Sequence, residues 1–315
     1  MYRFNKLSLF ALIVIIASML FGQEETGGGK LGSVGLKFLN INVDARDAAL
    51  GGSASLVSGA SSVFVNPAGL ASATGMAVSA GTFSWLVEST VTHASFAMPL
   101  MGGTVGLFYY TLDYGELNAT GWSANADGTT NFDPYNSTFK ANDVAMGAAF
   151  AKQLSDKFSI GGAAKMVSEN IDDYSISALA YDVGFQFATG YKNMNLGASI
   201  SNFGSDVQDA DEAYDEFALP MNFDFGVTGQ VYGDDAMGLV GGLNMAKFSD
   251  LGTEITLGGE FTVMGLAKLR GSYNLALVQF SAPSGVGKSP PPTKPFQKNL
   301  ARRHLGHGKL KLTSA

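Results

Sequence analysis

Few residues in this chain could perform chemistry, and their spacing does not assemble an active site. His93 is the only histidine outside the C-terminal part of the chain. Ser84 and Ser95 lie close to it in sequence, but no carboxylate is spaced to act as the third member of a Ser–His–Asp arrangement. We therefore expect no catalytic residues and no enzymatic activity.

Two polar segments hold oxygen ligands without the spacing of a metal site. In the segment 125–133, Thr130 takes the place of the glycine that a calcium loop requires, and Asn136 takes the place of its last glutamate. The second segment is an acidic cluster, interpreted either as a solvated loop or as a site for a cation or a basic partner: Asp211, Glu212, Asp215 and Glu216. We expect solvated loops at both places, and neither a metal nor a cofactor.

Phosphate and nucleic-acid binding have no support either. The segment 27–30 reads Gly-Gly-Gly-Lys, which lacks the full form of a P-loop and follows no predicted strand. Acidic residues number 27 against 20 basic ones, so no nucleic-acid surface is expected. Cysteine is absent, which excludes a disulfide framework, a thiolate metal site and a lipid-modified cysteine.

The first 22 residues have the three parts of a secretory signal peptide. Arg3 and Lys6 form a positive start, and an uncharged apolar run from Leu7 to Leu20 follows. That run is shorter than the roughly 20 residues that a membrane-spanning helix needs, and an uncleaved anchor is the alternative. We predict an exported protein whose signal peptide is cleaved after about residue 22.

The composition favours a membrane β-barrel over a soluble domain. Hydrophobic residues make up 46% of the chain and charged residues 15%, whereas ordinary soluble domains are about 25% charged. No apolar run after residue 22 is long enough for a membrane helix. A barrel fits these values because it places its apolar residues at alternate strand positions. A soluble β-sandwich is the alternative.

Apolar and polar residues alternate with the period of a β-strand in many segments. In the segment 220–232, Phe223 and Phe225 would share one face, and Asn222 and Asp224 the other. Such patterns predict eleven strands, near 76–85, 90–98, 103–112, 142–153, 157–168, 174–187, 193–203, 220–232, 236–248, 253–262 and 265–275.

The lengths of the strands and connections also favour a barrel. Most segments reach the about 9–11 residues that cross a bilayer at a tilt, whereas strands of soluble proteins have nearer to about 5–6 residues. Short turns such as 155–156 alternate with long polar connections at 113–141 and 204–219, which would face away from the cell. We expect aromatic residues near the strand ends to lie at the lipid–water interface: Trp85, Tyr109, Tyr110 and Tyr114.

The chain changes character after residue 278. Residues 279–315 lack Asp and Glu and are rich in proline and in basic residues, namely Lys288, Lys294, Lys298, Arg302, Arg303, Lys309 and Lys311. This tail could bind an anionic partner such as lipopolysaccharide, be a disordered extension, or be a frameshift product that replaces the last strands. We favour the frameshift, because an odd number of strands would leave an unpaired edge in lipid.

Two motifs of small residues stand between the signal peptide and the first predicted strand. The first, 45–54, reads Ala-Arg-Asp-Ala-Ala-Leu-Gly-Gly-Ser-Ala, and the second, 66–70, reads Asn-Pro-Ala-Gly-Leu. The pair Gly51-Gly52 allows close packing, and Asn66-Pro67 is a turn signal. By themselves, these motifs predict a segment that packs tightly, for instance inside the lumen of a barrel.

In this order and spacing, the two motifs resemble those of the PorV/PorQ family of outer-membrane proteins, which is related to the FadL transporters. The run 35–41, Gly-Leu-Lys-Phe-Leu-Asn-Ile, resembles the family's N-terminal run. The resemblance spans roughly residues 30–275. It implies an all-β, transmembrane, antiparallel FadL-like β-barrel of about 14 strands, with an N-terminal segment in the lumen. Eleven strands and a foreign tail would match such a barrel after the loss of about three strands.

The resemblance implies a bacterial outer-membrane location and two alternative functions. Family members in the type IX secretion system escort secreted proteins that carry C-terminal export domains, whereas FadL passes hydrophobic small molecules. We expect binding or escort of secreted proteins, and a channel for hydrophobic small molecules is the alternative. Escort requires matching cargo, and a channel requires a continuous apolar path from the loops to the lumen or to a lateral opening.

The chain is predicted to have four parts: a signal peptide (1–22), a linker and lumenal segment (23–74), a barrel (75–278) in outer-membrane lipid and a basic tail (279–315). The residues expected to have structural or gating roles are Arg46, Asp47, Gly51, Gly52, Asn66, Pro67 and Gly69. Arg46 and Asp47 are predicted to pair with lumenal charges such as Asp182, Asp224 or Lys165.

Overall fold

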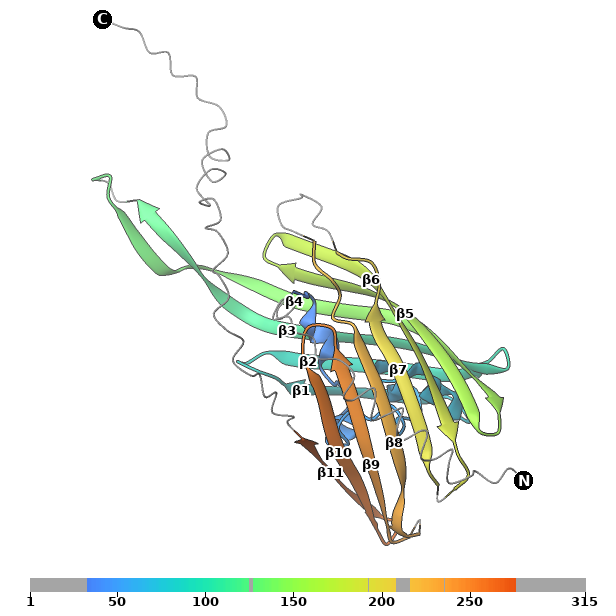
Figure 1. The fold of residues 1–315 in the computed structure, drawn as a ribbon. Coiled ribbons are helices and arrows are strands. Elements are labelled where there is room, and N and C mark those ends of the chain that lie inside the picture. Colours follow the sequence, from blue (N-terminus) through green and yellow to red (C-terminus); the bar gives the residue numbers. More distant parts are fainter. Residues whose placement is uncertain (1–32, 125–126, 192, 208–215, 235, 276–315) are drawn as a thin grey trace, which may run out of the picture. The chain divides into compact units, whose positions relative to one another are not determined.

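The computed structural model describes residues 33–124, 127–191, 193–207, 216–234 and 236–275 (Figure 1). The predicted signal peptide, the tail 279–315 and residues 211–215 of the acidic cluster lie outside these residues. A segment with four short helices precedes an 11-stranded sheet, in which every strand pairs antiparallel with its neighbours in chain order. The predicted antiparallel all-β fold is confirmed.

The strands coincide with the predicted segments except where β3 meets β4. They are β1 (Ala77–Ser84), β2 (Thr90–Leu100), β3 (Gly103–Ala124), β4 (Thr130–Ser155), β5 (Phe158–Ile171), β6 (Tyr174–Ala188), β7 (Asn195–Phe203), β8 (Asn222–Gly233), β9 (Gly238–Phe248), β10 (Thr253–Val263) and β11 (Ala267–Leu275).

The structure corrects the predicted loop 113–141, which is a continuation of β3 and β4. The two strands have 22 and 26 residues, and their pairing runs past Leu117 opposite Phe139 to Ala124 opposite Thr130. The loop was predicted from its content of Asn, Asp, Gly and Ser. Cross-strand pairing overrides such weak strand propensities, because strand preference depends mostly on the neighbouring strand.

The two faces of the sheet differ in polarity. In β6, Asp182 and Gly184 are buried on one face, whereas Val183 and Phe185 are exposed on the other. The buried face is called the inner face here, because the N-terminal segment lies on it. Exposed apolar side chains cover the outer face along the sheet, including Val78, Leu107, Met146, Phe150, Ile160, Met166, Leu179, Ile200, Leu243, Leu257, Phe261 and Leu269. A soluble one-sided sheet has the opposite arrangement, with its apolar face buried.

Residues 33–73, called the plug from here on, occupy the inner face. The plug contains η1 (Lys37–Asn40), α2 (Ala45–Ala49), η2 (Ala60–Phe64) and η3 (Pro67–Ser72). Asp44 caps α2 by accepting the N–H groups of Arg46 and Asp47. None of the helices that the described residues form has the length and apolar character to cross a membrane.

The two edges of the sheet both lie near α2. Among the described residues, β1 pairs only with β2, and β11 only with β10. The hydroxyl of Ser79 on β1 donates to Asp44 at 3.4 Å, and Glu260 on β10 lies 4.0 Å from the guanidinium of Arg46. The plug therefore contacts the sheet at both of its ends as well as across its middle.

Candidate functional site

Glycines on successive strands let the backbone of the plug approach the sheet closely. A Cβ atom at Gly161 would overlap the backbone of Pro67 and Ala68, and one at Gly184 would overlap the side-chain oxygen of Asn66. Three more glycines face residues 50–55 of the plug in the same way: Gly197, Gly226 and Gly258. Close backbone approach is one of the reasons for glycine in a strand, so the sheet is shaped for this plug.

Asn66 is the most completely engaged side chain of the plug, with no exposed surface. Its oxygen accepts the N–H of Ala68 at 3.0 Å and caps η3, in which Pro67 occupies a first-turn position that needs no N–H. Its amide nitrogen donates to three backbone carbonyls, those of Ala54 at 2.9 Å, Phe185 at 3.1 Å and Ala198 at 3.4 Å. One side chain thus connects two parts of the plug with β6 and β7.

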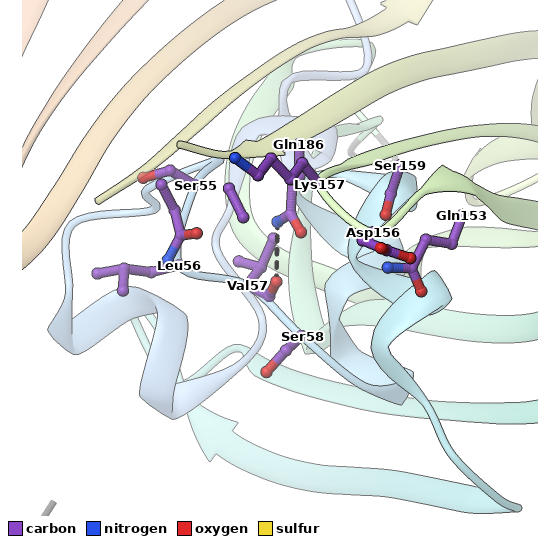
Figure 2. A pocket seen from close by; sticks show the side chains of 11 residues that line it. Ser55, Leu56, Val57, Ser58, Gln153, Asp156, Lys157, Ser159 and Gln186 are labelled. Carbon is purple, nitrogen blue, oxygen red and sulfur yellow. Dashed lines mark hydrogen bonds between the residues drawn. The ribbon is translucent and has the colours of Figure 1, made fainter. Parts of the chain in front are cut away.

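Gln186 is a second amide that binds the plug, and sequence analysis did not single it out. Its nitrogen donates to the carbonyls of Ala54 at 3.1 Å and Val57 at 2.9 Å, and Figure 2 shows the contact with Val57. The one sequence feature that could have identified Gln186 is its place on the polar, inner face in the alternating pattern of β6. Gly69, which was predicted to matter, packs against the same Val57 carbonyl and the side chain of Ser62.

Arg46 and Asp47 do not pair with the charges predicted for them. Arg46 lies 4.0 Å from Glu260 and 3.6 Å from Asp47, and it donates to the carbonyl of Leu56 at 3.1 Å. Glu260 also accepts from two cationic side chains of β11, Lys268 at 2.7 Å and Arg270 at 2.7 Å. Arg46 thus lies beside an inner-face charge, as predicted, but the three named partners are wrong, because strand pairing places Glu260 beside α2.

The predicted partners of Arg46 and Asp47 are engaged elsewhere. Lys165 and Asp182 form a buried ion pair between β5 and β6, with the two carboxyl oxygens at 2.9 and 2.7 Å from the amine. Asp182 also accepts the backbone N–H of Asn202 at 2.7 Å, and the amide of Asn202 donates to Asn40 of η1 at 3.2 Å. Asp224 accepts from Asn222 and Asn244. The ion pair of Lys165 and Asp182 thus helps to hold Asn202, which contacts η1.

Gly51 and Gly52 end α2 and turn the chain. Their φ angles are 76° and 68°, a region that residues with a side chain rarely adopt. The N–H of Gly52 donates to the carbonyl of Asp47 at 2.8 Å, which closes the last turn of the helix. A side chain at Gly51 would in addition overlap Thr256 of β10.

Asp47 is buried without a hydrogen-bond donor among the described residues. Its side chain is 1% exposed, and neither carboxyl oxygen accepts a hydrogen bond there. Burial raises the pKa of Asp47 to about 7, with a further contribution from Asp44, while Arg46 and Arg270 lower it. Removal of the carboxylate from water disfavours its charged form, which is the main cause of the shift.

We predict that the seating of α2 weakens as the pH rises from 3.8 to about 7. In that window the folded chain keeps a proton on Asp47 that the unfolded chain has lost, so stability falls with increasing pH. The loss is at most about 1.4 kcal/mol per pH unit. Hydrogen exchange of residues 44–52 at pH 5 and pH 8 measures this loss of stability. Asp47→Asn should remove the dependence, and a slope that persists in this variant would refute the assignment to Asp47.

A line of aromatic side chains crosses the inner face. Phe38 of η1 contacts Tyr110 with ring centroids 5.5 Å apart, and Phe64 of η2 contacts Tyr110 at 5.8 Å and Phe108 at 5.8 Å. The line joins two buried apolar clusters. One, around Leu36 to Val43, includes Val207 and Leu219 of the segment between β7 and β8; the other consists of Ala60, Val63, Leu70, Ala97, Phe108, Ala149 and Ala151.

The structure corrects the interface positions predicted for two tyrosines. Tyr110 is 5% exposed on the inner face, and Tyr114 donates its hydroxyl to Asp143 at 2.7 Å. Trp85 and Tyr109 are exposed. The alternation of the strand explains the difference, since neighbours such as Tyr109 and Tyr110 must face opposite sides. His93 also lies on the inner face, edge-on to Phe64 at 5.6 Å.

Two pockets open beside the plug, near the short turns. The first has a volume of about 240 Å³ and is mainly polar, lined by residues 55–58, Gln153, Asp156, Lys157, Ser159, Gln186, Ala188 and Asn195 (Figure 2). The second, of about 590 Å³, lies against the β2–β3 turn and is lined by Ala71, Ala73, Pro99, Leu100, Met101, Gly102, Gly103, Thr104, Ala151 and Gln153. Ala71, Ala73 and Ala151 also belong to the second apolar cluster or pack against it. This pocket therefore adjoins one end of the apolar line.

The fold and the plug together define a class of protein, an antiparallel β-sheet with an apolar outer face and a polar, plugged inner face. No protein-family model and no curated protein matches the chain. The Pseudomonas putida toluene transporter TodX is similar in structure, with 13% identity, coverage of 74% of this chain and 83% of that chain, and a TM-score of 0.49. A TodX deltaS2S3 mutant, described as a monoaromatic hydrocarbon channel, has 12% identity, coverage of 70% and 80%, and a TM-score of 0.45. These similarities identify neither a family nor a ligand, and the resemblance to PorV/PorQ stays a prediction.

Proposed function

We propose that this chain is a non-enzymatic outer-membrane transporter for apolar small molecules, in which the plug regulates access along the inner face. The apolar outer face supports a location in lipid. Soluble monomers rarely expose apolar patches larger than a few hundred Å², whereas transmembrane barrels carry apolar side chains outward at alternate positions. The strands are long enough for such a crossing, with 11 residues in β2, β9 and β10.

The observation that carries the proposal is the continuous apolar line inside an otherwise polar face. It runs from Val207 and Leu219 past Phe38, Tyr110 and Phe108 to the pocket at the β2–β3 turn. A channel for water-soluble molecules would favour polar groups there. Apolar side chains provide an environment into which apolar solutes partition from water, at about 25 cal/mol per Å² of buried area.

The plug closes this route, because its side chains supply a large part of the line. Phe38, Phe64 and Leu70 belong to the plug, whereas Tyr110 and Phe108 belong to the sheet. An apolar solute that replaces plug side chains against Tyr110 and Phe108 would preserve the burial of these residues. Displacement of the plug is therefore least costly for solutes that are themselves apolar.

We predict that Phe108→Gln reduces uptake of apolar solutes by about tenfold, because a polar amide in an apolar path costs about 1–3 kcal/mol. Phe108→Leu, the matched control, should keep uptake close to that of the wild type. The measurement is the entry of a radiolabelled monoaromatic hydrocarbon and of a long-chain fatty acid into cells that carry the protein, with glucose as a polar comparison. If the two variants transport equally, the line through Phe108 is not the route.

Escort of secreted proteins in a type IX-like system is the second candidate. It is favoured by the two motifs that carry the resemblance to PorV/PorQ, since residues 45–54 and 66–70 are among the parts of the plug that contact the sheet. A pull-down of the full chain from its own outer membrane in mild detergent separates the candidates. Secreted proteins that share a C-terminal domain would support escort, and bound fatty acids or other hydrophobes without protein partners would support transport.

A further inference from the structure

The hairpin of β3 and β4 extends far beyond its neighbouring strands and forms a two-stranded arm, residues 114–124 and 130–140 (Figure 1). The pairing of β2 with β3 ends at Thr90 opposite Asp113, and the pairing of β5 with β4 ends at Ile171 opposite Ala141. Beyond these positions, the strand partners of β3 and β4 among the described residues are each other, and the N–H of Asp172 in the β5–β6 turn donates to the carbonyl of Lys140 at 3.0 Å. A two-stranded hairpin in water is marginally stable by itself, and the outer edge of such a hairpin is a place where another strand can add.

The two edges of the arm are protected to different degrees. The β4 edge contains Pro134 and Lys140, and both residue types hinder the addition of another strand. The β3 edge, residues 114–124, contains no proline, lysine or arginine. The pairing shifts register between Asp113 and Glu116, with the extra residue on β3, and between Ala119 and Gly121, with the extra residues on β4. A regular stretch from Glu116 to Ala119 lies between the two shifts. The β3 edge is therefore the one available for an added strand.

An exposed apolar loop lies at the base of the same edge. The β1–β2 connection presents Leu86 and Val87 with 69% and 92% of their surface exposed. Val87 has a φ of 50°, a strained value for a β-branched residue. Because β2 begins at Thr90 opposite Asp113, a strand added along the β3 edge would continue the line of β2 and end beside this loop. Strained and exposed apolar residues of this kind cluster at binding sites.

The charges near this edge are mainly negative, and the one cation among them is Lys140, the cross-strand partner of Glu116. Glu88 lies in the loop, Asp113 at the base of the arm and Glu116 on its β3 strand, and no lysine or arginine occurs between residues 47 and 139. Glu116 accepts from Thr138 at 2.7 Å and is held in place on the arm. A partner strand with lysine or arginine side chains would therefore find complementary charge along the edge.

We propose that the β3 edge of the arm, together with Leu86 and Val87, binds an extended basic segment of another polypeptide by strand addition. Main-chain hydrogen bonds to residues 116–119 would supply affinity, and the acidic side chains would select for positive charge. An apolar residue at one end of the segment would cover Leu86 and Val87. This interaction is independent of the transport proposed above, because residues 116–119 lie outside both apolar clusters, and Tyr114 at the base of the arm is the part that packs against one of them.

The test uses the full chain in phosphatidylcholine nanodiscs and a synthetic strand peptide that alternates lysine and valine. Binding is followed by fluorescence anisotropy, and the contact is located by hydrogen exchange. We expect protection of residues 86–90 and 114–124, and about tenfold weaker binding for Glu88→Lys combined with Glu116→Lys. Asp173→Lys, the matched control on an exposed turn, should bind as the wild type does. The corresponding peptide with glutamate in place of lysine should not bind.

A second variant separates the arm from the rest of the protein. Replacing residues 118–138 by Asn-Gly joins Leu117 to Phe139 through a tight turn, since these two residues are cross-strand partners. We expect loss of peptide binding with unchanged uptake of apolar solutes. Equal binding of the lysine and glutamate peptides, binding that survives removal of the arm, or protection confined to β4 would overturn the proposal. Self-association of the protein through the arm, or protection of the loop by lipid alone, would also overturn it.

Discussion

We expect Asn66→Ala to weaken the contact between the plug and the sheet more than any other single substitution in the plug. The change removes hydrogen bonds to the carbonyls of Ala54, Phe185 and Ala198 and the cap of η3. The amide has two N–H groups, so about two full hydrogen bonds of about 1 kcal/mol each are lost, and the lost cap adds about 1 kcal/mol. We therefore expect the seating of the plug to weaken by about 3 kcal/mol while the strand pairing persists.

Two measurements check this result. Hydrogen exchange of residues 50–70 should speed up by about a hundredfold, which corresponds to about 3 kcal/mol, and conductance in planar bilayers should rise. Asn142→Ala is the matched control, because Asn142 is an exposed amide on the sheet that bonds Asn170. Gly184→Val approaches the same contact from the sheet, since its side chain would collide with the oxygen of Asn66. If exchange and conductance stay at wild-type values in both Asn66→Ala and Gly184→Val, this contact does not hold the plug in place.

Lys165→Met should be the most destabilising substitution in the sheet. The lysine and Asp182 are 6% and 3% exposed, so the change leaves a buried carboxylate without its counter-ion. Removal of one partner of a buried ion pair typically costs about 3–5 kcal/mol, whereas replacement of both can be nearly neutral. We expect about 3 kcal/mol lower stability for Lys165→Met and partial recovery when Asp182→Asn is added, because the asparagine oxygen can still accept the N–H of Asn202.

Urea unfolding in lipid vesicles, followed by tryptophan fluorescence, measures both variants and their coupling. Lys152→Met is a suitable control, since Lys152 is an exposed lysine on the neighbouring strand β4. Because Asp182 also holds Asn202, which contacts Asn40 of the plug, Lys165→Met should in addition increase exchange in η1. A cost below about 1 kcal/mol would mean that water reaches the pair, as it does for surface ion pairs.

The proposed transport and the proposed strand binding use different parts of the same sheet. The apolar line lies on the inner face and involves Tyr110, and Tyr114 at the base of the arm still packs against it, whereas the stretch proposed to bind a strand lies further along β3, from Glu116 to Ala119. Successive side chains of β3 face opposite sides of the sheet. Because β3 and β4 are longer than their neighbours, the arm lies beyond the remainder of the sheet. Variants in one part are therefore expected to leave the other unaffected, since distant substitutions without shared partners act independently.

The sequence by itself determined the eleven strands apart from the arm, their two faces and the tight packing of the plug. Alternation at positions such as Val183 and Phe185 against Asp182 is a local property of the chain, so the outer and inner faces could be predicted from it. The motifs at 45–54 and 66–70 indicated tight packing, because small residues and a turn signal are also local.

Only the tertiary structure decided which side chains meet. Arg46 lies beside Glu260, although they are more than two hundred positions apart in the chain, and Asn66 reaches carbonyls on β6 and β7. Such contacts depend on strand register, and a shift of one residue would move every side chain to the opposite face. The arm was missed for the same reason: residues 114–140 are polar, and only the pairing of β3 with β4 makes them strands. Local preference specifies faces, while partners across the sheet are specified by the assembled register.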